Sequence, residues 1–392
     1  MIQHPRQIDR RTTCLAMFAL LLFAGPPATA QDNGQGASFE LPDPAVDAIL
    51  SSNPQTPAAI LQATLSLTDL GRPQLARDMF GNLVKLKLNE GQQADLVEAA
   101  GSDKMFRLLA LDNLGDEARK FASSALAAAD KRARDPKRLA KLIELLQSES
   151  AETRRSALVD LKEGREAAVA ALLAALADDD RAADHPLVAS AILSLAPIAA
   201  GPIFGALETE QAGFKARVIS LVPHVKIPGA AYYLIGPALD ESQPDVRAAA
   251  RRALQRMLGQ SPPSKRVVEV LDRHILHLLT SPAPLDVDHA GNVVLWHWDD
   301  RKRSLSQQIV AAEKAGALLA ARLARHLVAL PAEFEGDRIA ALAVILEADR
   351  VRVGNGAPLP TGPRDALSVA ANLASHDIER ILVRSMQLEL PG

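Results

Sequence analysis

Three clusters of side chains in this sequence have types and spacings that suit metal-ion chemistry. The first cluster begins like a calcium-binding loop, with Asp286, Asp288 and Gly291 in the right order. The third ligand position of such a loop falls on Ala290, and the position that needs a bidentate glutamate falls on His297. Two of the required oxygen donors are therefore missing, and we do not predict a calcium site.

The second cluster contains four histidines, and the third contains four acidic turns. His274 and His277 lie three residues apart in a predicted helix, with His289 and His297 further along. No glutamate stands at the spacing of a zinc-protease motif, so we interpret them as surface or interface histidines. The acidic turns are densest at 178–180, where a divalent cation or a basic partner would fit. Solvated turns are the simpler interpretation, and we predict no metal and no cofactor.

Covalent catalysis lacks its usual residues. The single cysteine, Cys14, lies in an apolar N-terminal segment. Motifs for serine hydrolases, zinc proteases, P-loops and dinucleotide-binding folds are absent, so we predict that the protein is not an enzyme. The formal net charge is −3 and the pI is about 6.3, which is not the basic balance of a nucleic-acid-binding domain.

Residues 1–30 have the pattern of a signal peptide. Arg6, Arg10 and Arg11 precede a short apolar run, and Ala28-Thr29-Ala30 supplies a cleavage signal. The alternative is an uncleaved membrane anchor, but a span needs about 20 apolar residues. We expect an exported protein, periplasmic or secreted, with no disulfides and no membrane span after cleavage. Residues 31–56 are predicted to form a linker.

The central part of the chain repeats one pattern four times. An apolar helix ends at Leu146, Leu176, Leu207 and Leu239, so the pattern recurs after 30, 31 and 32 residues. Each polar break leads into a second apolar helix, and Ala and Leu dominate both helices. A period near 30 with two helices per unit is typical of a helical solenoid. We assign this array to residues 137–259.

Two of the second helices resemble those of HEAT repeats. Residues 150–158 read S-x-E-x-R-x-x-A-L, and residues 244–250 read P-D-V-R-x-x-A. The resemblance implies an all-α fold, a right-handed α-α superhelix of the HEAT/armadillo-like solenoid type. The middle units depart from it at 186–188 and 213–215, so we expect no unbroken ladder of acid–arginine pairs.

The flanking segments are predicted to be helical as well. Residues 57–130 and 309–349 resemble tetratricopeptide helix pairs, with a generic helical hairpin as the alternative for the first. Residues 260–308 are predicted to hold a linker, a helix and one small inserted β-hairpin that contains both tryptophans. Residues 364–390 are predicted to form a C-terminal amphipathic segment. The basic run at 131–138 is interpreted as a solvated helix end.

This architecture predicts a non-enzymatic scaffold of the cell envelope or exterior that binds a protein or peptide on a concave surface. Arginine and tryptophan dominate interface hot spots, so such residues on the second helices and in the hairpin are the candidates. Pairing with neighbouring turns, or packing of the hairpin, are the alternatives for them. A HEAT-like enzyme of lyase type and a structural envelope component are the rival functions. The candidate partner-binding residues are Arg154, Arg155, Lys215, Arg217, Arg247, Arg251, Trp296 and Trp298.

Overall fold

The computed structural model describes residues 43–259, 264–281, 285–328, 330, 334–354, 356–361 and 365–388. The chain divides into two units, 1–53 and 54–392. The described part of the first unit is helix α1 (Pro44–Ser51), whose N-terminus is capped by the side chain of Asp43. This helix lies within residues 31–56, which the sequence predicts to form a linker. The expected signal peptide lies outside the described residues.

The second unit begins with helices that pack in pairs. α2 contacts α3, and α6 contacts both α4 and α5. Thr56 caps α2, and a reciprocal capping box between Asn89 and Gln92 starts α4. A 3-10 turn at Asp112–Leu114 separates α5 from α6. The bounds are α2 (Pro57–Asp69), α3 (Pro73–Lys85), α4 (Glu90–Ala100), α5 (Ser102–Ala110) and α6 (Gly115–Ala133).

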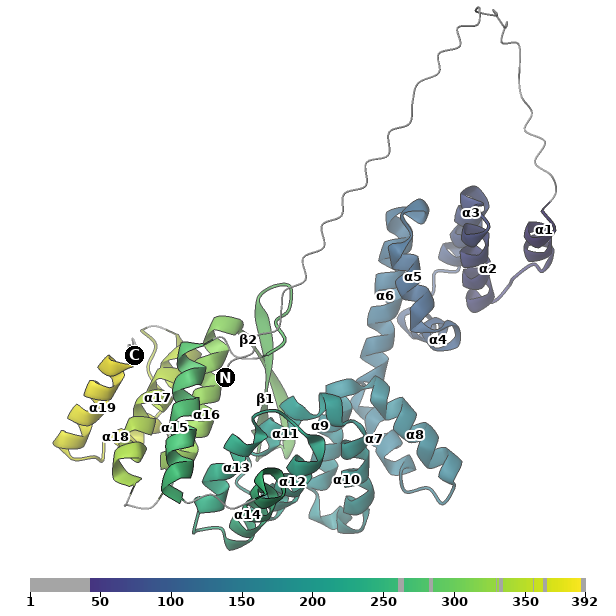
Figure 1. Ribbon diagram of the computed structural model, residues 1–392. Coiled ribbons are helices and arrows are strands. Elements are labelled where there is room, and N and C mark those ends of the chain that lie inside the picture. Colours follow the sequence, from purple (N-terminus) through teal and green to yellow (C-terminus); the bar gives the residue numbers. More distant parts are fainter. Residues whose placement is uncertain are drawn as a thin grey trace, which may run out of the picture. The chain divides into compact units, whose positions relative to one another are not determined.

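All eight helical segments predicted for the array are α-helices. We call α7, α9, α11 and α13 the first helices, and α8, α10, α12 and α14 the second helices (Figure 1). Short 3-10 turns occur at 179–184 and 196–198. The bounds are α7 (Pro136–Leu145), α8 (Ala151–Glu163), α9 (Arg165–Leu176), α10 (His185–Ser194), α11 (Ala200–Ala206), α12 (Ala212–Val225), α13 (Ala230–Leu239) and α14 (Pro244–Leu258).

Contacts between helices of the same class link consecutive units of the array. Among the first helices, α9 contacts both α7 and α11. Among the second helices, α12 contacts both α10 and α14. The helices from α7 to α12 thus contact helices of their own unit and of an adjacent unit, whereas α13 contacts α14, α15 (Ser264–Thr280) and α16 (Ala312–Val328).

The predicted β-hairpin is confirmed, and it separates two groups of helices in the sequence. β1 (Asn292–Asp299) pairs antiparallel with β2 (Ser304–Ala311), in the register Val294↔Ile309 and Trp298↔Leu305. The helices around it are α15 (Ser264–Thr280), α16 (Ala312–Val328), α17 (Glu335–Val353), α18 (Ala366–Ala370) and α19 (Ser375–Gln387). No helix in the described ranges combines the length and apolar character that crossing a bilayer requires.

Two predicted boundaries are wrong. The helix expected from residue 309 begins at Ala312, because Ile309 and Val310 are β-branched and pair with β1 instead. The expected C-terminal segment is not continuous, since residues 371–374 separate α18 from α19. Residues 389 and 390 of that segment lie outside the described residues.

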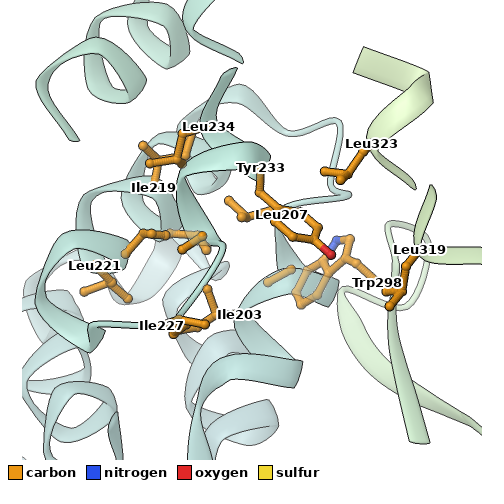
Figure 2. Close-up of a cluster of buried hydrophobic side chains, with 14 of the residues drawn as sticks. Ile203, Leu207, Ile219, Leu221, Ile227, Tyr233, Leu234, Trp298, Leu319 and Leu323 are labelled. Atoms are coloured by element: carbon orange, nitrogen blue, oxygen red, sulfur yellow. The ribbon is translucent and has the colours of Figure 1, made fainter. Parts of the chain in front are cut away.

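The hairpin lies between the array and the C-terminal helices, and its core side chains join theirs. β1 contacts α11 and α16, and β2 contacts α9 and α16. Figure 2 shows Trp298 close to Leu207 and Tyr233 of the array and to Leu319 of α16. The close approach of β1 to α11 depends on Gly205, where an added Cβ would lie 2.9 Å from the Cβ of Trp296. Glycine at this position lets the strand reach the helix backbone.

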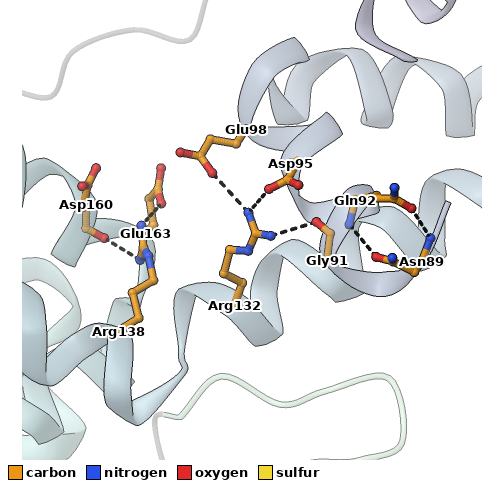
Figure 3. A network of polar contacts seen from close by, with 9 residues as sticks. All are labelled: Asn89, Gly91, Gln92, Asp95, Glu98, Arg132, Arg138, Asp160 and Glu163. Carbon is orange, nitrogen blue, oxygen red and sulfur yellow. Dashed lines mark hydrogen bonds and ion pairs between the residues drawn. The ribbon is translucent and has the colours of Figure 1, made fainter. Parts of the chain in front are cut away.

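The basic run at 131–138 begins in the last turn of α6, as predicted, and its cations also form ion pairs that the prediction did not include. Arg132 contacts Asp95 at 2.6 Å and Glu98 at 3.3 Å, and it donates to the carbonyl of Gly91 (Figure 3). Lys131 pairs with Glu90 at 2.8 Å. These acids lie on α4, between 34 and 41 residues earlier in the chain, so a local reading of the sequence does not identify them as partners.

Burial of Trp298 predicts a large loss of stability on truncation. Its side chain is 3% exposed and its ring lies 4.6 Å from that of Phe214. We expect Trp298→Ala to lower the free energy of unfolding by about 3 to 5 kcal/mol, because the cavity left behind cannot close completely. Urea unfolding followed by circular dichroism measures this change.

The matched control is Val294→Ala on the same strand, where the side chain is 46% exposed. That change is expected to cost less than about 1 kcal/mol. Equal costs at the two positions would show that the hairpin is not part of the core.

Candidate functional site

A partly buried polar cluster joins the turn after α11, strand β1 and helix α16. Glu208 lies in the turn with 16% of its side chain exposed, and it forms ion pairs with Arg322 and His297. Arg322 also donates to the carbonyl oxygen of Trp296 at 2.7 Å. Burial raises the pKa of Glu208, but the hydrogen bond from His297 and the charge of Arg322 outweigh it, so the net pKa lies below its ordinary value.

Asp300 holds the tip of the hairpin against the same turn. Its carboxylate accepts hydrogen bonds from the hydroxyl of Thr209 at 2.7 Å and from the indole N–H of Trp298 at 2.9 Å. The other oxygen accepts from the backbone N–H of Glu210 at 3.1 Å. The fully buried Thr209 hydroxyl is thereby satisfied. The cluster is a structural joint, because each of these polar groups is used within the fold.

A second buried site lies beside this joint, at Lys215 and His326. The two residues line a cavity of about 30 Å³ together with Gly236 and Asp240. Burial lowers the pKa of His326 to about 3, with the charges of Lys215 and Arg325 adding to the effect. Burial also lowers the pKa of Lys215. The cavity has the size of about one water molecule, so it has no room for a substrate.

A groove between the second helices α12 and α14 carries three arginines, and we call it the arginine groove. Its volume is about 420 Å³. Arg217 donates from Nη2 to Asp179 at 2.8 Å, but its buried Nε has no hydrogen-bond partner. Arg252 and Arg256 are exposed and pair with no carboxylate in the described part of the chain. The acid that lines the groove is Asp245.

A larger groove lies between the first helices α7 and α9 and the hairpin, and we call it the hairpin groove. Its volume is about 720 Å³. The floor is apolar, with Leu139 and Ile143 from α7 and several alanines from α9. Trp296, Leu305 and Gln307 form the hairpin side. Arg134 and Arg181 at its rim are each paired within the fold, with Asp130 and Asp184.

Most of the predicted arginines are bound to nearby turns. Arg154 donates to the carbonyl oxygens of Ser148 and Glu149, and Arg251 donates to that of Ala238. Arg247 pairs with Glu241 at 3.4 Å, and Arg155 is exposed. Whether they bind a partner remains a prediction.

The other predicted residues fall in different places. Arg217 lines the arginine groove, as expected for a second-helix residue. Lys215 does not, because its side chain turns inward toward His326. Trp298 is buried in the core, so a partner has no access to it in this structure. Trp296 is 7% exposed and lines the hairpin groove. The eight candidates therefore do not form one surface.

Sequence reasoning missed Arg252, Arg256 and the buried joint. Asp245, Arg252 and Arg256 lie at positions i, i+7 and i+11, which is one face of α14. That spacing is visible in the sequence, and it identifies a face that Arg247 and Arg251 do not share. No local signal identifies Glu208 and Arg322 as partners, because they lie on elements far apart in the chain.

The clusters first considered for metal binding have other contacts. Asp288 accepts hydrogen bonds from the backbone N–H groups of Ala290 and Asn292, so it caps a turn. His274 stacks on Tyr232 with ring centroids 3.7 Å apart. Among the described residues, no group of three His, Cys, Asp or Glu side chains has a geometry suited to a metal ion.

The partly buried His326 predicts that stability decreases in acid. A histidine in an unfolded chain has a pKa of about 6.5, whereas His326 has a pKa of about 3 in the fold. Between these two pH values the unfolded state binds a proton that the folded state does not. The contribution of His326 to the free energy of unfolding is therefore complete above about pH 6.5, and it falls by up to about 1.4 kcal/mol per pH unit below that pH. Urea unfolding between about pH 5 and pH 7 measures the slope.

His326→Gln is expected to flatten that slope, whereas His224→Gln, at an exposed position on α12, should leave it unchanged. An unchanged slope in His326→Gln would mean that another group titrates in this range.

Comparison of the chain with protein-family models, with curated proteins and with solved structures returned no match. The function is therefore inferred from the residues and geometry of the chain itself.

Proposed function

We propose that this protein is an exported, non-enzymatic scaffold that binds a protein or peptide through its helical array. The proposal includes a HEAT/armadillo-like solenoid with tetratricopeptide-like flanks, a signal peptide at 1–30, and a periplasmic or secreted location. The contacts of α9 with α7 and α11, and of α12 with α10 and α14, support the solenoid. A right-handed superhelix is the form that the HEAT resemblance implies.

The arginine groove is the observation that carries the binding proposal. Three guanidinium groups and one carboxylate line it, which leaves an excess of positive charge. Its floor consists of small residues, including Ala216, Ala249 and Ala253, so the long arginine side chains form its walls. The guanidinium of Arg217 is held at the wall of the groove by its hydrogen bond from Nη2 to Asp179.

This chemistry favours an acidic segment of a partner protein. Guanidinium groups bind carboxylates through two parallel hydrogen bonds, which gives direction as well as attraction. Arg252 and Arg256 are free to make such pairs, since neither has a carboxylate partner within the described residues. Arg217 already holds Asp179, so it would contribute mainly through its remaining donors.

The rival functions predict different behaviour. A lyase-type enzyme would need an enclosed site for a substrate, whereas the arginine groove is open and the enclosed cavity at His326 has a volume of about 30 Å³. A structural envelope component would depend on its surface charge as a whole rather than on this groove. Charge reversal confined to the groove therefore separates the scaffold from both rivals.

Reversing two charges in the groove is expected to abolish recognition of acidic peptides. Fluorescence polarisation would measure binding of a labelled dodecapeptide that contains four glutamates, with a glutamine version for comparison. We expect the double change Arg252→Glu and Arg256→Glu to weaken binding at least tenfold, about 1.4 kcal/mol or more. Binding to the unchanged protein should also weaken as salt is raised, because the pairs are accessible to solvent.

The matched control reverses two exposed lysines outside the groove, Lys120→Glu on α6 and Lys162→Glu on α8. The net charge changes by the same amount, so binding should be retained if the groove is the site. Equal losses in both double variants would favour a general charge effect and contradict the proposal.

A further inference from the structure

Strand β2 has an outer edge whose backbone groups are available for pairing. The hairpin has two strands, so each strand pairs on one side and presents its other side to its surroundings. On β1 that side is partly closed, because Arg322 donates to the carbonyl of Trp296 and Asp288 N–H donates to the carbonyl of Asn292. No such contact exists on β2 in the described residues.

The same contacts identify which groups of β2 point outward. In an antiparallel pair, the N–H and C=O of one residue point to the same side, and the side alternates along the strand. The carbonyl of Trp296 points away from β2, so Trp296 and its partner Gln307 form a pair that is not hydrogen-bonded. Gln307 therefore turns its own N–H and C=O outward, and so do Leu305 and Ile309. No described residue hydrogen-bonds to these groups.

The sequence of β2 carries none of the usual protection of an edge strand. Natural edge strands discourage pairing with another chain through lysine, inward charges, proline or a bulge. Residues 304–311 read S-L-S-Q-Q-I-V-A, without a charged residue or a proline. Gln307 and Gln308 are exposed, and the side chain of Ile309 is 69% exposed. The edge is therefore accessible as well as unpaired.

The hairpin groove lies along this edge. β1 packs on α11 and β2 packs on α9, while α7 contacts α9 (Figure 1). The outer edge of β2 therefore faces the side of the array where α7 lies. A third strand beside β2, about 4.8 Å away, would lie over the floor that α7 and α9 provide. That floor is apolar at Leu139, Ile143 and Ala171.

We propose that the outer edge of β2 binds an extended peptide segment of a partner protein by strand addition. The backbone of the segment pairs with Leu305, Gln307 and Ile309. Its alternate side chains face the floor of the hairpin groove and are apolar, whereas those between them face solvent and are polar. Backbone hydrogen bonds supply affinity in this mode, and the pockets for alternate side chains supply selectivity. This second surface is independent of the arginine groove.

A single strand fits this position better than a second copy of the chain. Two copies of the chain could pair their β2 strands antiparallel, related by a two-fold axis perpendicular to the sheet. The α7–α9 floors of both copies would then lie on the same side of the joined sheet. The α7 helix of each copy would then occupy the space beneath β2 of the other copy, which α9 already fills. A separate peptide brings no such helices.

The test uses the full chain and a labelled peptide in which Val and Thr alternate, with a Lys at each end. In an extended peptide, successive backbone N–H groups point to opposite edges. Two further peptides therefore carry N-methyl groups on alternate nitrogens, so that each peptide has the N–H groups of one edge blocked. Only one edge of the bound peptide pairs with β2. We therefore expect one methylated isomer to bind at least about tenfold more weakly than the unmodified peptide, and the other isomer to bind equally well.

Two variants test the protein side. Gln307→Pro removes an outward N–H without touching the β1–β2 ladder, and it should weaken binding by a similar factor. Gln307→Ala keeps that N–H and removes only the side chain, so it should bind the peptide more tightly than Gln307→Pro. Amide hydrogen exchange should show protection of Gln307 and Ile309 on binding. If Gln307→Pro does not fold, the two methylated isomers and the exchange data decide.

Three results would overturn the proposal. One is absence of binding at about 1 mM unmodified peptide, and another is equal binding of both methylated isomers. The third is a dimer in solution that Gln307→Pro converts to a monomer, since the edge would then be occupied by a second copy. The double change Arg252→Glu and Arg256→Glu should leave binding of this peptide intact, so the two surfaces can fail separately.

Discussion

The ion pair between Glu208 and Arg322 is the interaction on which the rest of the arrangement depends. Arg322 neutralises a carboxylate that is 16% exposed, and it simultaneously fixes the backbone of β1 at Trp296. A charge so enclosed is stable only when it is paired and hydrogen-bonded. The pair therefore sets where α16 and β1 lie against the turn after α11, and through Trp296 of β1 it bears on one side of the hairpin groove.

The two grooves differ because the first and second helices carry different side chains. Alanines dominate the floor of both, and small side chains allow close helix packing and leave room above it. On α12 and α14 the walls are arginines, which attract charged groups. On α7 and α9 the wall is a strand, whose backbone attracts another backbone. One array thus offers two binding surfaces, one suited to acidic side chains and the other to an extended peptide backbone.

The sequence was sufficient for what depends on neighbouring residues. The helices of the array follow from Ala and Leu periodicity, and the hairpin follows from alternation around Trp296 and Trp298. It was insufficient where tertiary packing selects among adjacent positions. Arg251 and Arg252 differ by about 100° around a helix, and the packing of α12 on α14 decides which faces the groove. Lys215 turns inward because His326 and Asp240 lie there, which no local pattern indicates.

The hairpin also bears on how the chain reaches this structure. Glu208 and His297 are separated by 89 positions, and Thr209 and Asp300 by 91. The helix pairs of the array need only short loops to close, so they form quickly, whereas these contacts must close a long loop first. Until the hairpin packs against the array, the ring of Phe214 is not covered by the indole of Trp298. In a chain that emerges in order from its N-terminus, Phe214 and the residues of α11 that contact β1 are therefore made long before the strand that covers them.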